Sequence, residues 1–133
     1  MKTITLNEDE LRRFMEHPDD GPVVMINLLR FRPETDGGES GEAAYARYTR
    51  RAVPFVAQVG GRLLWQGRAD QLLVGGEEDR WDRVLMVEYP SRAAFLEMVA
   101  MPGFRATQED RVAALESTVL IAATTERSVL DEG

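Results

Sequence analysis

A single amide lies inside the most apolar run near the start of the chain. Asn27 is flanked by mostly aliphatic residues from Val23 to Phe31, and Pro22 and Pro33 bound the run. A short apolar run of this kind predicts a buried strand. Leucine would pack better at a buried position, so Asn27 is a candidate to bind a carbonyl or enolate oxygen. The alternative is a structural amide that bonds to a neighbouring strand or a helix end.

Aromatic and amide side chains elsewhere in the chain could complete a pocket around that amide. Tyr45 and Tyr48 are three residues apart and share one face of a predicted helix. One hydroxyl could reach a pocket, or both rings could belong to the core with their hydroxyls at its rim. Trp65 precedes Gln66 in a predicted strand and favours a core position. Trp81 begins a strand, where it could wall a pocket or cover the end of a barrel.

Glu88 is the remaining candidate for acid–base chemistry. It could act as a general base if it is buried. The alternative is an ion pair across strands with Arg68 or Arg30. The catalytic candidates are therefore Asn27, Tyr48 and Glu88, and the ligand-binding candidates are Asn27, Tyr45, Tyr48, Trp65, Gln66 and Trp81.

Composition narrows the range of cofactors and partners. The chain has one histidine and no cysteine, so we expect no metal site. Its glycine pairs are turns without a phosphate-binding motif, and we expect no cofactor. A net charge of −7, from 16 basic and 23 acidic residues, argues against nucleic acid and anionic membranes as partners. With no signal-peptide pattern or long apolar run, a cytoplasmic location is the default expectation.

Caps, prolines and hydrophobic periodicity place these residues on elements. The 133 residues fit one domain with a polar tail over 125–133. Asn7, with Glu10 three residues later, predicts a capped first helix over 7–16. The further predicted elements are strand 23–31, helix 41–59 with Pro54 inside it, strands 62–67 and 71–74 as a hairpin, strand 81–89, helices 92–101 and 104–117, and strand 119–124. This order predicts an α+β fold of the ferredoxin-like βαββαβ kind, with one antiparallel sheet and helices on one face.

Alternation along the strands predicts which side of the sheet each residue occupies. One side is aliphatic and should meet the helices, and the other is mixed. We expect Val24, Ile26 and Leu28 on the helix side, and Met25, Asn27, Leu29, Gln66 and Glu88 on the mixed side. A mixed side of this kind predicts cover by a second subunit, so we expect a homodimer in which sheet faces sheet.

The run from Val24 to Phe31 resembles the "VMLNLLKF" signature of the DUF1330 family. Other pieces agree with that family in the same order, across about residues 22–124. These are Tyr45 with Tyr48, Gly60-Gly61 with Gly67, and Trp81-Asp82 through Val84 to Tyr89-Pro90-Ser91. The resemblance implies a dimeric α+β barrel, as in small monooxygenases, muconolactone isomerases and chlorite dismutases. It implies no particular activity.

Two functional hypotheses follow from the sequence. In the first, the protein is a homodimer that binds a small carbonyl or aromatic compound, and whether it also acts as a cofactor-independent enzyme is left open. In the second, it is a non-enzymatic structural or interaction domain whose sheet face is only a dimer interface.

Overall fold

The computed structural model of the chain describes residues 6–129. The elements in chain order are α1 (Glu8–Glu16), β1 (Val23–Phe31), α2 (Gly41–Gln58), β2 (Arg62–Arg68), the 3₁₀ turn η1 (Glu77–Asp79), β3 (Arg83–Tyr89), α3 (Arg92–Ala100), α4 (Pro102–Ala114) and β4 (Leu115–Ala123). The four strands form one antiparallel sheet in the order β2-β3-β1-β4. The predicted α+β, ferredoxin-like fold is confirmed. Residues 130–133 of the predicted polar tail lie outside the described part.

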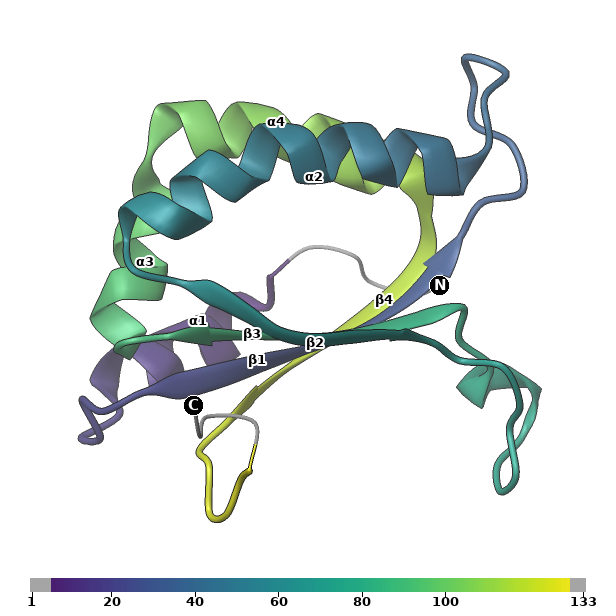
Figure 1. The fold of residues 1–133 in the computed structure, drawn as a ribbon. Helices are drawn as coiled ribbons and strands as arrows, with labels where there is room; N and C mark the ends of the chain where they lie inside the picture. The colour runs from purple at the N-terminus through teal and green to yellow at the C-terminus, as the bar shows by residue number, and fades with distance from the viewer. Residues whose placement is uncertain (1–5, 130–133) are drawn as a thin grey trace.

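Two long helices cover one face of the sheet. In Figure 1, α2 and α4 lie side by side above it, while α1 and α3 gather at one end. The helix starts follow from local chemistry. Asn7, Ser40 and Ser91 each accept a hydrogen bond from the backbone amide three residues later, at 3.0–3.1 Å. Pro102 is the first residue of α4 and separates it from α3.

Some predicted boundaries are wrong. Residues 71–74 form no strand, because β2 already pairs along its length with β3 and leaves this segment in a loop. That loop extends below the sheet, on the side away from α2 and α4 (Figure 1). β3 begins at Arg83 rather than Trp81, and β4 begins at Leu115 rather than Val119. α2 continues through Pro54 to Gln58.

The predicted sides of β1 are also wrong, and they are inverted. Met25 packs into the core beneath the helices, and Leu29 packs with Tyr45 of α2. Asn27 pairs with Leu85, which belongs to that same core side. Both sides of β1 are apolar, so its alternation could not indicate which one meets the helices. We call the side of the sheet under α2 and α4 the inner face and the opposite side the outer face.

A bulge in β2 changes the sides of its central residues. Leu63 pairs with Val87, but Trp65 pairs with Met86, so the register shifts at Leu64. Trp65 therefore lies on the outer face, although a core position was predicted for it. Gln66 pairs with Leu85 and joins the inner face, not the opposite side on which we expected it.

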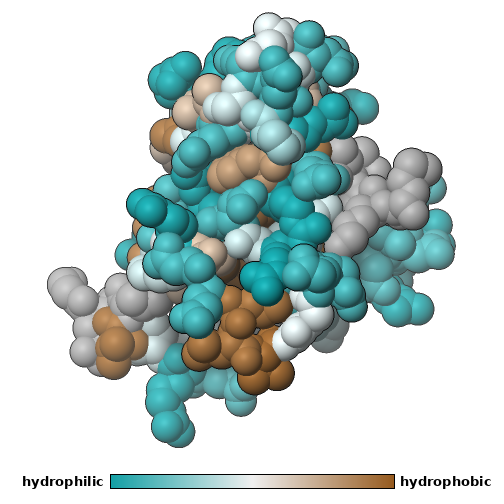
Figure 2. All heavy atoms as spheres, turned by 90° about the vertical axis from the view of Figure 1, so that its right-hand side faces the viewer, coloured by the Kyte–Doolittle hydropathy of each residue, from teal (hydrophilic) through white to brown (hydrophobic). Residues whose placement is uncertain are grey.

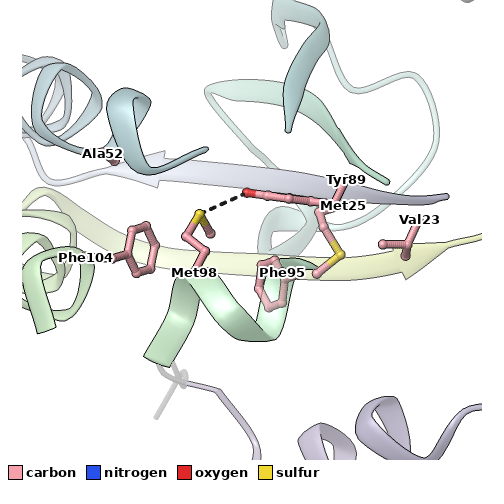
Figure 3. Close-up of a cluster of buried hydrophobic side chains, with 7 residues drawn as sticks. All are labelled: Val23, Met25, Ala52, Tyr89, Phe95, Met98 and Phe104. Atoms are coloured by element: carbon pink, nitrogen blue, oxygen red, sulfur yellow. Dashed lines mark hydrogen bonds between the residues drawn. The ribbon is translucent and has the colours of Figure 1, made fainter. Parts of the chain in front are cut away.

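The larger hydrophobic cluster lies at the α3 end of the inner face. Figure 3 shows Tyr89 and Met25 from the sheet facing Phe95 and Met98 of α3, with Phe104 of α4 beside them. The Tyr89 hydroxyl donates to the Met98 sulfur at 3.8 Å, and the rings of Tyr89 and Phe95 meet edge to face at 5.2 Å. This cluster anchors α3 and the start of α4 against the sheet.

Candidate functional site

A large cavity separates the inner face from the helices. Its volume is about 1410 Å³, and its walls come from α1, α2, α3, α4 and all four strands. Val53 of α2 and Leu63 of β2 line it and are also exposed to solvent, which places an opening between α2 and the edge strand β2. We call this space the inter-layer cavity.

Asn27 lies at the middle of the cavity floor. It pairs with Leu85 on one side and Leu120 on the other, and Gln66 follows Leu85 in the same row across the sheet. The Asn27 side-chain nitrogen donates to the Met25 carbonyl oxygen at 3.3 Å. Within residues 6–129 its amide oxygen has no hydrogen-bond partner. The amide therefore does not tie β1 to a neighbouring strand or helix end, which was the structural alternative for this residue.

Tyr45 and Tyr48 form the roof of the cavity from α2. Their ring centroids are 5.1 Å apart, and Tyr45 also contacts Phe31 of β1 at 5.6 Å. Tyr45 is only 5% exposed. Burial, with the neighbouring Tyr48, raises the pKa of Tyr45 to about 12, and the nearby Arg111 guanidinium partly offsets this rise. Tyr45 therefore holds its proton at neutral pH.

Arg111 and Thr118 add further polar groups to the cavity. Both line the cavity, and Arg111 Nη2 donates to Thr118 Oγ1 at 3.4 Å. The Thr118 hydroxyl in turn donates to the Leu28 carbonyl oxygen at 2.8 Å. The last strand was predicted to begin at Val119, so Thr118 fell outside it. Its side of the sheet could therefore not be predicted from the sequence. Arg111 lies in a predicted helix whose cavity-facing side could not be identified without the fold.

Three predicted site residues do not reach the inter-layer cavity. Trp65 lies on the outer face, where its ring covers Gly67. Trp81 precedes β3, and the Arg30 guanidinium lies 5.3 Å from its ring centroid. Glu88 forms an ion pair with Arg62 at 3.0 Å. An ion pair across strands was the alternative predicted for Glu88, but with Arg68 or Arg30 as its partner. The cavity thus brings together Asn27, Tyr45, Tyr48 and Gln66, without either tryptophan or Glu88.

The described residues place further limits on the site. No group of three or more histidine, aspartate or glutamate side chains within residues 6–129 is arranged to hold a metal ion. In the same range, no helix has both the length and the apolarity needed to cross a bilayer.

Comparisons with known proteins agree with the fold. The model of a family described as "Domain of unknown function (DUF1330)" matches residues 40–125. This range includes Tyr45 and Tyr48 and excludes the β1 motif from which we first inferred the resemblance. A protein of unknown function from Rhodopseudomonas palustris is 34% identical over 96% of this chain and 100% of its own, with a TM-score of 0.90.

More distant structures share the fold alone. SnoaB, a cofactor-independent oxygenase from Streptomyces nogalater, is 16% identical over 82% of this chain and 97% of its own, with a TM-score of 0.56. A dimeric protein of unknown function with a ferredoxin-like fold from Bacteroides fragilis is 14% identical over 79% of this chain and 97% of its own, with a TM-score of 0.53. No curated protein matches the sequence.

Proposed function

The chain belongs to the DUF1330 family, and on that premise we propose that it binds a small carbonyl or aromatic compound in the inter-layer cavity. One observation carries the proposal. The Asn27 side-chain amide lies in a cavity of about 1410 Å³ that is otherwise largely apolar, and among residues 6–129 only one of its two Nδ2 hydrogens is bonded, which leaves the second to donate to a ligand oxygen. Binding pockets for small molecules are mostly apolar, with a few polar groups that orient the ligand. The cavity has this character and exceeds the usual size.

The predicted residues that do line the cavity have distinct parts in the proposed site. The Asn27 amide orients the oxygen of the ligand, and Gln66 offers a second amide in the same row of the sheet. The tyrosine hydroxyls can donate or accept hydrogen bonds, and Met25, Leu85 and Val87 supply apolar walls. Cofactor-independent catalysis is the extension of this proposal. SnoaB gives fold-level support only, because a shared fold does not transfer a reaction.

We further propose that the protein is a homodimer through its outer face. The central row of that face is wholly apolar: Ile121, Ile26, Met86 and Trp65. Trp65 and Ile121 are each 45% exposed in the single chain. The Bacteroides fragilis structure is of a dimeric protein, which supports a dimer as a state that the fold can adopt. Since the ligand cavity lies on the other side of the sheet, each subunit would hold a site of its own.

Binding of the aromatic ketone prodan tests the ligand proposal. Its fluorescence shifts to shorter wavelength in an apolar site, and its carbonyl oxygen can accept a hydrogen bond from the second Nδ2 hydrogen of Asn27. We expect Asn27→Leu to weaken binding by about two- to tenfold, the worth of one hydrogen bond, without lowering the melting temperature. A stability loss with unchanged binding would instead identify Asn27 as a structural amide.

A second pair of variants tests the location of the probe. Thr49 lines the cavity from α2, and the adjacent Arg50 does not. We expect Thr49→Trp to narrow the cavity beneath α2 and weaken prodan binding by roughly tenfold, because the added ring takes up space beside Asn27 that the probe would otherwise use. Arg50→Trp adds the same bulk outside the cavity and should leave binding unchanged. Equal effects of the two variants would place the probe elsewhere and support the alternative of a non-enzymatic interaction domain.

A further inference from the structure

Arg92 is a buried cation without a counter-charge in the described part of the chain. Its side chain is 8% exposed, and no carboxylate of residues 6–129 lies within ion-pair distance. Nη1 donates to the Asp19 backbone carbonyl at a long 3.4 Å, and the guanidinium lies 5.4 Å from the centroid of the Phe14 ring. Nε is shielded from solvent and has no hydrogen-bond partner among residues 6–129.

This arrangement is costly for the free protein. Arginine stays charged at all ordinary pH values, and removing that charge from water requires compensation by an anion or by full hydrogen bonding. One long hydrogen bond and one aromatic ring supply only part of it. Arg92 is also the first residue of α3, where the partial positive charge of a nine-residue helix adds to its own. The position is therefore electrostatically prepared for an anion.

Arg92 lines the inter-layer cavity at the end that is closed by α1 and α3. The other cavity arginines are paired or exposed. Arg62 pairs with Glu88, Arg13 pairs with Glu10, Arg111 contacts Thr118, and Arg105 is exposed. Among these cavity arginines, Arg92 is the one whose guanidinium is buried and still has hydrogen-bond donors to offer. Its position therefore marks where a charged group of a ligand would bind.

We propose that the ligand is an organic carboxylate whose charged end is bound by Arg92 while its other end lies near Asn27. The inference rests on the proposed function and names the class of compound. With Nη1 engaged by Asp19, Nε and Nη2 remain as the parallel pair of donors that matches the two oxygens of a carboxylate. A singly charged group also suits one arginine in a chain of net charge −7 better than a phosphate.

The two ends of the proposed site set the length of the ligand. Val23 pairs with Tyr89, just before α3, and lies four residues from Asn27 along β1. Four residues of an antiparallel strand span roughly 13 Å. Two fused or linked rings, with an oxygen at one end and a carboxylate at the other, fit this span.

A matched pair of compounds tests the proposal by isothermal titration calorimetry. 6-Acetyl-2-naphthoate carries a carboxylate, and 6-acetyl-2-naphthamide is its neutral counterpart of nearly the same shape. We expect the protein to bind the carboxylate about tenfold or more tightly than the amide, the usual gain from a charged hydrogen-bonded pair. Arg92→Gln should abolish this preference and keep binding of the amide. Arg62→Gln, which changes an arginine already paired with Glu88, should leave the preference intact.

The outcomes separate this inference from the proposed function. Equal binding of the two compounds by the unmodified protein would overturn the carboxylate assignment and leave a neutral-ligand cavity. Binding of neither compound would overturn both. A preference that persists in Arg92→Gln would assign the charge recognition to another residue and refute the role of Arg92. If Arg92→Gln does not fold, Arg92→Lys keeps the charge and loses the paired donors, so the preference must still fall.

Discussion

The ionisation of Tyr45 is coupled to the fold. Its phenol is buried between α2 and the sheet, beside Tyr48 and Phe31. Burial disfavours the phenolate and raises the pKa of Tyr45 to about 12, from an ordinary value of 10.0. The pKa of Tyr89 is also raised by burial, with the other two tyrosines adding to the effect. The neutral phenol is therefore part of the folded state.

This shift predicts a loss of stability in alkali. Below pH 10, Tyr45 is protonated in both the folded and the unfolded chain. Between pH 10 and about 12 the unfolded chain releases this proton and the folded chain keeps it, so the free energy of unfolding falls as pH rises. For Tyr45 the full effect is on the order of 2 to 3 kcal/mol. In urea denaturation at pH 9, 10 and 11, the free energy of unfolding should decline less steeply with pH for Tyr45→Phe than for the unmodified protein. Tyr89 should account for the decline that remains. The same dependence on pH in both proteins would refute this coupling.

At the residue scale, sequence could identify polar groups but not their surroundings. Asn27 was singled out because an amide interrupts an apolar strand, and that contrast is visible without a fold. Its side of the sheet was not predictable, because β1 is apolar on both sides and period-two alternation leaves the choice open. Arg92 illustrates the opposite limit. Nothing in a Ser-Arg pair at a helix start indicates that the arginine is buried, with no counter-charge among residues 6–129.

At the scale of elements, Gly41 joins three parts of the fold. It begins α2, its amide donates to the Arg32 carbonyl oxygen at 2.8 Å, and the Arg32 amide donates to the Ala114 carbonyl oxygen at 2.9 Å. A Cβ atom on Gly41 would overlap both of those carbonyl oxygens. The end of β1, the start of α2 and the end of α4 therefore meet at a point where only glycine fits.

We expect Gly41→Ala to lower the free energy of unfolding by about 2 to 3 kcal/mol, because backbone atoms must move apart to admit the methyl group. Gly37→Ala, in the preceding loop, is the matched control, since its Cβ would meet only the Thr35 hydroxyl at 3.9 Å. That change should stay within about 0.5 kcal/mol of the unmodified protein. Chemical denaturation of the two variants measures the difference, and equal stabilities would show that the junction tolerates a side chain.

Local signals predicted elements well where one residue decides the backbone. Asn7, Ser40 and Ser91 are helix caps, and Pro102 separates α3 from α4, as their chemistry indicates. Features set by pairing were not predictable. The bulge at Leu64 depends on the register with β3, and the loop over 71–74 has strand-like composition but no neighbouring strand to pair with.

At the scale of the whole molecule, the single chain leaves an apolar surface uncovered. The long helices α2 and α4 both lie on the other side of the sheet from the outer face (Figure 1), and its central row contains the exposed Trp65 and Ile121. The loop that carries Leu73 and Val74, 83% and 91% exposed, extends below the same face. Figure 2 shows a compact hydrophobic patch low on the surface at that end of the molecule. Contiguous apolar surface of this kind favours association with another protein surface.

The homodimer proposal predicts that the protein has twice the 15.0 kDa mass of the chain in multi-angle light scattering at micromolar concentration. Placing Glu at both Trp65 and Ile121 should convert it to monomer, because each copy would then oppose like charges across a desolvated, symmetric interface. Val53→Glu is the control: Val53 is similarly exposed but lies on α2, on the other side of the sheet. It should leave the dimer intact. If the unmodified protein is only monomeric, the proposed assembly is refuted. If Val53→Glu alone dissociates the dimer, the interface lies on the helical side of the sheet, where it would close the opening of the inter-layer cavity.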